Sequence, residues 1–294
     1  MKKIGFIGVG IMGKSMVRNL MKAGFELHIY ARTKSKVEDV ISEGAIFHES
    51  IKSCVEGCDA VITIVGFPKD VEEVYFDKDN ILDSAMQGAY LIDMTTTSPQ
   101  IAEKIYAEGT KRGFHVLDAP VTGGDTGAKA GTLSILVGGE KEDYEACMPL
   151  FEAMGTNINY QGKAGCGQHC KLANQIMIAG TLSGVCEALT YAKEQGLDLD
   201  TVMKSVATGA AGSKQLDTFG PKIINGDYAP GFFMKHFIKD MKLALVEANR
   251  KGLSLDVLSL VLANYEELEA EGLGDLGTQA LVKFYDEEHR CTEE

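Results

Sequence analysis

Residues 3–13 read KIGFIGVGIMG, and this stretch decides the fold. An apolar, β-like run passes directly into the pattern Gly8-x-Gly10-x-x-Gly13, and a helical pattern follows that closes at Gly24. In this strand–turn–helix context the glycines predict a dinucleotide-binding turn. Gly8 allows the tight turn, Gly10 lets the backbone approach a pyrophosphate, and Gly13 lets the helix pack on the strand. The helix start offers the phosphates free N–H groups and a positive dipole end.

Outward from this turn, the first half of the chain alternates short β-rich runs with amphipathic stretches. The alternation predicts right-handed crossovers and a doubly wound, Rossmann-type α/β fold with a mainly parallel sheet. The predicted strands are residues 3–7, 26–30, 60–65, 90–94, 115–121, 133–137 and 157–160, and the predicted helices between them are 13–22, 34–43, 68–74, 99–111 and 141–154.

Beyond residue 164 the pattern changes to long stretches with a 3.6-residue period, at 168–195, 200–208, 236–251 and 256–271. Gly165 and Gly167 mark the junction. We therefore expect a dinucleotide-binding domain at 1–164 and an all-helical domain at 165–294. The second domain is expected to begin with a long interdomain helix and to contribute to substrate binding and oligomerisation.

Charge and composition exclude several classes of protein. With 29 Lys+Arg against 42 Asp+Glu the formal net charge is −13, which repels nucleic acid. The longest uncharged stretch, 172–186, falls short of the roughly 20 apolar residues of a membrane span. The N-terminal run breaks into glycines, unlike a signal peptide. Seven cysteines without such a signal indicate free thiols, so we expect a cytoplasmic protein that binds neither membrane nor nucleic acid.

The segment after the strand at 26–30 bears on the choice of cofactor. Arg32, Thr33 and Lys36 stand where an NAD-preferring site usually has the acidic residue that binds the ribose 2′-hydroxyl. An arginine with a hydroxyl and lysines nearby suits a 2′-phosphate, although the same residues also read as a solvated helix start. The sequence favours NADP(H), with NAD(H) as the alternative cofactor.

Later strand ends add candidate ligand-binding residues, because ligands of an open α/β sheet lie along the carboxyl ends of its strands. Val65 follows one strand on the side expected for adenosine. Thr96 follows the next and offers a hydroxyl near the nicotinamide ribose, although Ser98-Pro99 behind it also reads as a helix start. We place Gly138-Gly139 on this edge as well, as a tight turn.

Thr122, Gly123 and Gly124 follow the strand at 115–121. One hydroxyl and two backbone amides there can hold a carboxylate, as a backbone nest does.

The start of the long helix carries a lysine. Lys171, Asn174 and Gln175 stand at i, i+3 and i+4 and share one helical face. A lysine within an apolar helical stretch is costly to bury unless it is paired or functional. Periodicity alone leaves two interpretations open, a functional lysine and a surface lysine near a helix start.

Five motifs together resemble those of the β-hydroxyacid dehydrogenases. They are GFIGVGIMG at 5–13, DMTTTSP at 93–99, DAPVTGG at 118–124, GKAGCGQHCKLAN at 162–174 and KDMKLA at 239–244. The family includes 3-hydroxyisobutyrate dehydrogenase, tartronate semialdehyde reductase and the glyoxylate/succinic semialdehyde reductases. The resemblance runs in order over almost the whole chain. The stretch 231–245, with Lys235-His236, looks nearest to the last of these subgroups.

The resemblance implies roles for individual residues. Lys171 matches the catalytic lysine and Asn174 the asparagine beside it. Residues 122–124 match the substrate-binding stretch, with Thr122 where the family commonly has serine. Thr96, Lys239 and the glycine-rich turn, with Ile11 and Met12, match cofactor contacts. The resemblance also implies a homodimer or homotetramer.

The expected reaction is hydride transfer between NADP(H) and a small 3-hydroxy (or 2-/4-hydroxy) carboxylic acid/semialdehyde pair, with Lys171 as general acid/base. The expected partner is therefore a small carboxylate-bearing aldehyde or hydroxyacid.

Other interpretations compete with this one. Cys166, His169 and Cys170 lack the further ligand pair that a closed zinc site needs, so we expect helix-packing thiols and no metal. A non-catalytic NADPH-binding module is expected to lose the lysine, and imine reductases typically replace it. A 6-phosphogluconate-dehydrogenase-like enzyme is a longer chain with basic residues for the sugar phosphate. The sequence leaves the role of His236 open.

Overall fold

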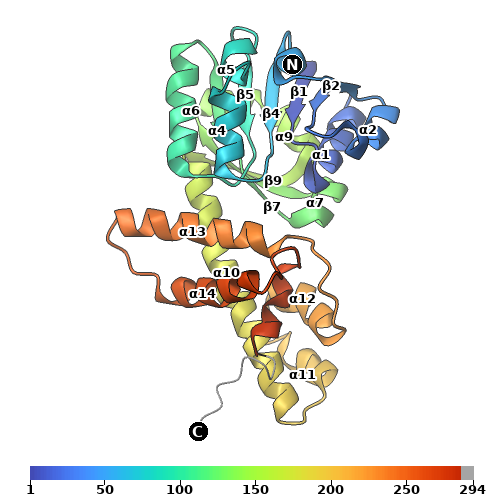
Figure 1. The fold of residues 1–294 in the computed structure, drawn as a ribbon, viewed down its shortest axis with the longest axis vertical. Coiled ribbons are helices and arrows are strands. Elements are labelled where there is room, and N and C mark those ends of the chain that lie inside the picture. The colour runs from blue at the N-terminus through green and yellow to red at the C-terminus, as the bar shows by residue number, and fades with distance from the viewer. Residues whose placement is uncertain (286–294) are drawn as a thin grey trace. The chain divides into compact units, whose positions relative to one another are not determined.

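The computed structural model describes residues 1–285 and divides into two compact units, Met1–Lys171 and Leu172–Glu294 (Figure 1). The end of the predicted helical domain, residues 286–294, lies outside the described residues, and so does the seventh cysteine, Cys291. Each unit has its own hydrophobic core.

The first unit is built on one nine-stranded sheet in the order β3-β2-β1-β4-β5-β6-β8-β7, with β9 paired to β8. The strands from β3 to β6 are all parallel, which is the Rossmann order and confirms the predicted fold class. The strand bounds are β1 Lys3–Ile7, β2 Glu26–Tyr30, β3 Ile46–Phe47, β4 Ala60–Thr63, β5 Tyr90–Asp93, β6 His115–Asp118, β7 Val121–Thr122, β8 Leu133–Gly139 and β9 Gly155–Gly162.

Helices cover both faces of this sheet, because successive residues of each central strand point to opposite sides. On β4, Val61 packs under α3 to α6 and Ile62 packs on the face covered by α1 and α9. The helices of this unit are α1 Ile11–Lys22, η1 Lys34–Lys36, α2 Glu38–Ser42, α3 Ile51–Val55, α4 Pro68–Phe76, α5 Ile81–Ser84, α6 Pro99–Lys111, α7 Gly124–Ala130, α8 Lys141–Ala146 and α9 Met148–Met154.

The sequence prediction was wrong at the last strands. The strand predicted at 115–121 ends at Asp118, and Val121–Thr122 forms the separate strand β7, with Pro120 between them. Because β8 runs antiparallel to β6, Gly138-Gly139 does not end on the ligand edge but passes beside Asp118 toward the opposite edge. Both glycines are residues of β8 and not a tight turn.

Two predicted helices are divided. The helix expected at 34–43 consists of η1 and α2, because Val37 between them has a φ of −125° and is buried outside the helical conformation. The helix expected at 141–154 is interrupted at Cys147, just before Pro149, which has no backbone N–H to continue the helix. Short elements such as β3 and α5 were not predicted.

In the described residues of the second unit the regular secondary structure is helical, apart from a single bridge between Phe233 and Gly277. Its helices are α10 Cys166–Glu194, which begins in the first unit, α11 Leu199–Val206, α12 Lys214–Ile224, α13 Met234–Arg250, α14 Asp256–Ala270 and η2 Thr278–Tyr285. Helix α12 was not predicted, because Gly220-Pro221 interrupts its helical pattern.

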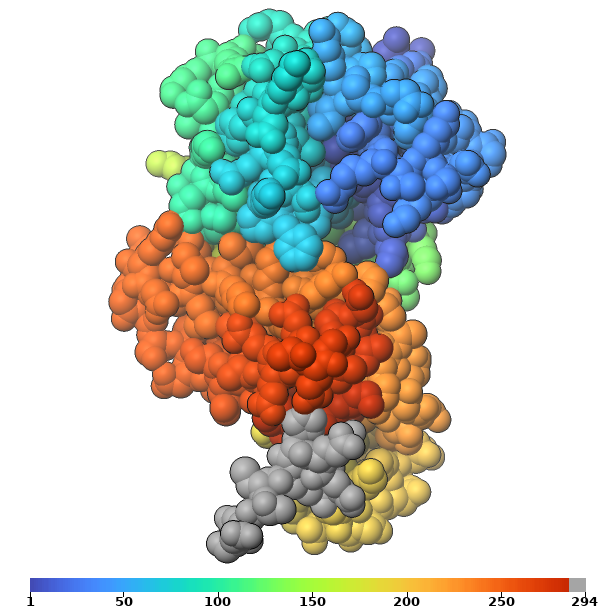
Figure 2. All heavy atoms as spheres, in the orientation of Figure 1, coloured from blue at the N-terminus to red at the C-terminus, as the bar shows by residue number. Residues whose placement is uncertain are grey.

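Helix α10 is the central element of the second unit, where its apolar residues pack with those of α13 and α14. In the view of Figure 1 it passes behind α13 and α14, and in Figure 2 the orange and red residues of those two helices form the surface on that side. By length and composition alone α10 is the one described helix that could cross a membrane, a test that core helices of soluble proteins also pass.

Candidate active site

Glycines shape the turn between β1 and α1. Gly8 has a φ of 99°, and a Cβ added there would lie 2.1 Å from the carbonyl oxygen of Ile64. A Cβ on Gly13 would lie 2.2 Å from the Gly8 carbonyl oxygen, so the helix packs directly on the strand end. A Cβ on Gly10 would meet no described atom within 4 Å. The space beside Gly10 is therefore open.

This turn fits a dinucleotide pyrophosphate. Gly10 is the N-cap residue of α1, and no described side chain caps the first-turn amides of that helix. Free amides, a positive dipole end and open space are what a phosphate group needs at a helix start. Ile11 is exposed and Met12 is half-buried in the same turn.

The cofactor-selecting segment follows β2. Arg32 is exposed, and its guanidinium lies 3.2 Å from a carboxylate oxygen of Asp70. The other oxygen of Asp70 accepts the backbone N–H of Phe67 at the start of α4, at 2.9 Å. Asp70 therefore ties Arg32 to the segment after β4, a contact that the sequence analysis missed. Thr33 and Lys36 are also exposed.

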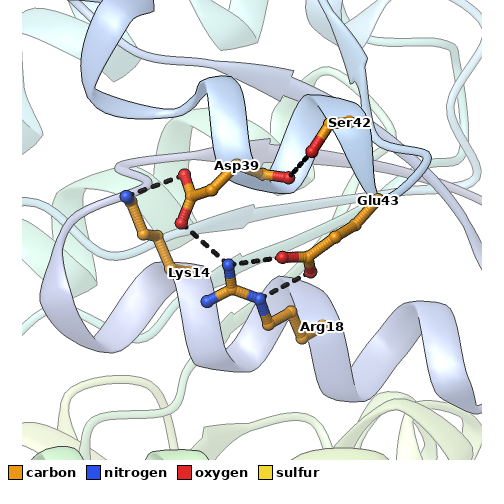
Figure 3. Close-up of polar contacts among 5 residues, drawn as sticks. All are labelled: Lys14, Arg18, Asp39, Ser42 and Glu43. Carbon is orange, nitrogen blue, oxygen red and sulfur yellow. Dashed lines mark hydrogen bonds and ion pairs between the residues drawn. The ribbon is translucent and has the colours of Figure 1, made fainter.

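Four charged side chains join α1 to α2, the helix that follows this segment (Figure 3). Lys14 and Arg18 both bind Asp39, each at 2.8 Å, and Arg18 also binds both oxygens of Glu43. Lys14 and Arg18 hold the pKa of the Asp39 carboxyl well below its usual range. This ion cluster fixes α2, and with it the end of the cofactor-selecting segment, against the helix that begins at the glycine-rich turn.

Thr95, Thr96 and Thr97 follow β5, and their exposure differs. Thr95 and Thr97 are buried, whereas Thr96 is half-buried. The Thr95 hydroxyl accepts the backbone N–H of Val65 at 3.0 Å, which joins the ends of β4 and β5. Thr96 is therefore the most accessible of the three threonines.

Gln168, on the first turn of α10, binds the same segment. Its side-chain oxygen accepts the N–H of Thr97 at 3.0 Å, and its side-chain nitrogen donates to the carbonyl oxygen of Thr95 at 2.7 Å. We call these three residues the Gln168 bridge. Gln168 lies within the motif at 162–174, but its role was not predicted from the sequence.

Asp118, at the end of β6, caps α10. Its two carboxylate oxygens accept the backbone N–H groups of Gly165, at 2.8 Å, and Gln168, at 2.9 Å. Burial raises the pKa of Asp118 to about 7, although these two N–H donors oppose the rise. Gly138 packs closely against Asp118, because a Cβ added to Gly138 would lie 2.6 Å from the Asp118 carboxylate.

The predicted carboxylate-binding stretch, residues 122–124, follows Asp118 closely in the chain. Thr122 pairs with Ser134 of β8 and is half-buried. Gly123 and Gly124 have φ values of 129° and 64° at the start of α7. Both conformations suit glycine, and they bring two consecutive amides into one short loop.

Lys171 is the last residue of the first unit and is buried, with 7% of its surface exposed. It stands three residues after Gln168, so the two share a face of α10. The Gln168 bridge and the Asp118 cap therefore hold the helical turn directly before the candidate catalytic lysine.

Asn174 and Lys239 are joined within the second unit. The Asn174 side chain donates to Gln175 at 2.8 Å, and Gln175 donates to a carboxylate oxygen of Asp240 at 2.7 Å. The other oxygen of Asp240 lies 3.0 Å from the Lys239 ammonium. Asp240 is fully buried, and the sequence analysis missed its part in this chain.

Within residues 1–285, the cysteines and His236 do not form a second candidate site. Cys166 and Cys170 are partly exposed, and across residues 1–285 no group of three or more His, Cys, Asp or Glu side chains could hold a metal ion. The ring of His236 stacks on Phe232 at 6.4 Å and meets Phe233 edge-on.

Comparison with known proteins places these features in a family. Residues 3–162 match the family model for the NAD binding domain of 6-phosphogluconate dehydrogenase, and residues 165–285 match the model described as NAD-binding of NADP-dependent 3-hydroxyisobutyrate dehydrogenase. The uncharacterized oxidoreductase YkwC of Bacillus subtilis is 50% identical, over 97% of this chain and 99% of its own.

Two further proteins are similar along their whole length. The NAD-dependent L-serine dehydrogenase of Pseudomonas aeruginosa is 34% identical over 97% of this chain and 98% of its own. The solved structure of Mycobacterium tuberculosis 3-hydroxyisobutyrate dehydrogenase with L-serine has a TM-score of 0.88 at 28% identity, and it covers 97% of this chain and 99% of the other.

Fold and relatives together define an NAD(P)-dependent oxidoreductase that acts on hydroxyacids. The chain belongs to the β-hydroxyacid dehydrogenase family, as its five motifs predicted.

Proposed function

We propose that this enzyme transfers hydride between NADP(H) and a small 3-hydroxy (or 2-/4-hydroxy) carboxylic acid/semialdehyde pair, with Lys171 as general acid/base. The observation that carries the proposal is the buried Lys171 on the turn of α10 that the Gln168 bridge and the Asp118 cap hold. A fixed backbone is what a proton donor requires, because the ammonium group must be held at one position relative to the reacting oxygen.

The chemistry follows from the residue types. NADPH, when bound at the glycine-rich turn, would supply the hydride that the aldehyde carbon receives. As negative charge develops on the aldehyde oxygen, the Lys171 ammonium stabilises it and then donates the proton to that oxygen. In the oxidative direction neutral Lys171 accepts the hydroxyl proton. Asn174 holds the reacting oxygen or orients the lysine.

Thr122, Gly123 and Gly124 bind the substrate carboxylate in this proposal. The half-buried Thr122 hydroxyl and the two consecutive amides supply hydrogen-bond donors to an anion. Lys239 lies on α13, where Asp240 holds its ammonium group. In this proposal Lys239 would contact the nicotinamide end of the cofactor, the role that the family resemblance implies. The methyl group of threonine, compared with serine, narrows the pocket toward small acids.

For the cofactor, we propose a preference for NADP(H). Arg32 is exposed and oriented by Asp70, and the exposed Thr33 and Lys36 follow it. These groups suit a 2′-phosphate, because guanidinium and phosphate form charge-assisted hydrogen bonds. The NADP-dependent description of the second family model supports the same choice, whereas the similar L-serine dehydrogenase is NAD-dependent.

We also propose a homodimer or homotetramer. Large apolar side chains of the second unit are exposed in the single chain, among them Met177 and Tyr191 of α10 and Val257 and Leu260 of α14. A self-associating surface would cover them. Light scattering coupled to size-exclusion chromatography tests this, and a monomer at micromolar concentration would contradict it. A cytoplasmic location stays a prediction from the sequence.

Initial rates test the catalytic proposal. NADPH and NADH oxidation is followed at 340 nm with glyoxylate, succinic semialdehyde, methylmalonate semialdehyde and tartronate semialdehyde. The proposal expects turnover with NADPH and one preferred aldehyde. A preference for NADH would contradict the Arg32 argument alone, and absence of turnover with all four, despite tight cofactor binding, would contradict the proposed reaction.

A further inference from the structure

Gln168 is a fully buried glutamine one helical turn before Lys171, and the proposed chemistry gives its side chain no contact with the substrate or the reacting atoms. Long polar side chains rarely become fully buried without partners. Its position therefore calls for an account of what its amide group does.

Both ends of that amide are used, and in one orientation only. The oxygen faces the N–H of Thr97, which can only donate, and the nitrogen faces the carbonyl of Thr95, which can only accept. Rotating the amide by half a turn would set donor against donor and acceptor against acceptor. The residue between these two contacts is Thr96.

Gln168 also joins the ends of three strands. The backbone N–H of Gln168 binds Asp118 at the end of β6, and its side chain binds the segment after β5. Thr95 of that segment in turn binds Val65 after β4. One turn of α10 is thus fixed to the carboxyl ends of three neighbouring parallel strands. Movement of Gln168 would displace the Thr96 loop and the start of the helix together.

We propose that Gln168 is a positioning residue. Gln168 holds Thr96 in position for the cofactor. It also holds the first turn of α10, and this fixes the position of Lys171 relative to Thr96. The inference rests on the proposed function for the roles of Thr96 and Lys171. Gln168 itself is not proposed to touch the substrate or the reacting atoms.

The first test removes the amide and keeps the volume. In Gln168→Met the bridge is lost, and we expect kcat to fall about 10- to 100-fold, the scale of a misplaced catalytic group. The primary isotope effect with 4-deuterated NADPH should rise, because hydride transfer becomes slower relative to product release. KM for the aldehyde should change less than about threefold, because Thr122–Gly124 binds the carboxylate separately.

A matched control is Gln279→Met. Gln279 is equally buried and donates to the carbonyl oxygens of Asp227 and Ala229, which belong to the second unit. This variant should lower the melting temperature as Gln168→Met does while leaving kcat within about threefold of wild type. Equal loss of kcat in the two variants would overturn the inference, and so would an unchanged kcat in Gln168→Met.

The second variant, Gln168→Glu, gives a signature that general destabilisation would not. A protonated carboxyl group reproduces the amide, since its carbonyl accepts from Thr97 and its O–H donates to Thr95. An ionised one sets a carboxylate against the Thr95 carbonyl. Activity relative to wild type should therefore rise as pH falls. Asp118, Asp93 and Lys171 are present in both proteins, so the ratio of the two activities compares proteins that differ only in the new carboxyl group. A ratio independent of pH would contradict the inference.

A third readout separates this inference from the proposed function. NADPH affinity is measured by fluorescence titration without any aldehyde. Gln168→Met should bind NADPH about tenfold more weakly than wild type, because the Thr96 loop is displaced. If wild type turns over no aldehyde but the affinity falls as expected, the proposed reaction fails and the positioning role stands. Unchanged affinity would overturn the role.

Discussion

Arg32 is the residue on which cofactor choice depends. Its guanidinium is paired with Asp70, and its side chain is nevertheless 76% exposed, so it is held after β2 and remains open to a ligand. An arginine so oriented can bind a 2′-phosphate without first losing the freedom of a mobile side chain.

We expect Arg32→Ala to raise KM for NADPH at least about tenfold while KM for NADH changes less than threefold, because charge-assisted hydrogen bonds to the phosphate are lost. Steady-state rates with both cofactors check this. Arg112→Ala is the control, since Arg112 pairs with Asp83 on another part of the unit. A parallel loss with both cofactors would mean that Arg32 does not read the 2′-phosphate.

At the scale of elements, the β1–α1 turn separates two kinds of glycine. Gly8 and Gly13 are required by the chain itself, since a Cβ on either would overlap backbone atoms. Gly10 is not, since a Cβ there has open space. The distinction lets folding and cofactor binding be disturbed one at a time.

We therefore expect Gly10→Ala to fold with a melting temperature close to wild type and to bind NADPH at least about tenfold more weakly, because the added methyl occupies the place of the phosphate. Gly8→Ala should fold poorly, with a positive φ and a backbone clash. Circular dichroism and fluorescence titration measure the two effects. Full NADPH affinity in Gly10→Ala would remove the pyrophosphate from this turn.

The ion cluster of Lys14, Arg18, Asp39 and Glu43 acts at the same scale, between α1 and α2 (Figure 3). We expect Arg18→Met to lower the melting temperature by about 2–4 °C at low ionic strength and by less in high salt, since these side chains are partly exposed. The control is Lys111→Met, which removes a single exposed pair with Glu108 and should have almost no effect.

The pH dependence of this cluster has a definite sign. The pKa of Asp39 is depressed below its ordinary value of 3.8. A depressed carboxyl pKa stabilises the fold above the unfolded value and loses that effect as pH falls through the folded one. The difference in melting temperature between wild type and Arg18→Met should therefore be full at neutral pH and shrink below about pH 4. A difference that grows on acidification would rule out this pairing.

At the scale of the whole molecule, alternation of strand and helix predicted the parallel Rossmann sheet, and five motifs predicted the family. Periodicity is a local signal, so both were accessible. The reversal of β8 was not, because it depends on the break at Pro120 and on pairing between residues 12 to 22 positions apart. Gly138 then packs on Asp118 instead of facing a ligand.

The candidate site divides in the same way. Residues that belong to a motif, such as Lys171 and Thr122, could be named from the sequence. Their supports could not, because Gln168 binds residues 71 and 73 positions away and Gln175 binds Asp240 at 65. The sequence gives the type of a side chain, such as an amide or a carboxylate, but not the distant residue to which it is hydrogen-bonded.

The central claim is that Lys171 supplies the proton, and single-turnover kinetics test it most directly. Enzyme in excess over NADPH is mixed with the preferred aldehyde, and NADPH absorbance is followed in wild type, in Lys171→Ala and in the control Lys163→Ala, which removes an exposed lysine before the same helix. We predict that Lys171→Ala slows the decay at least about 100-fold while NADPH affinity and the Lys163→Ala rate stay near wild type. Decay at a near-normal rate in folded, NADPH-bound Lys171→Ala would contradict the account.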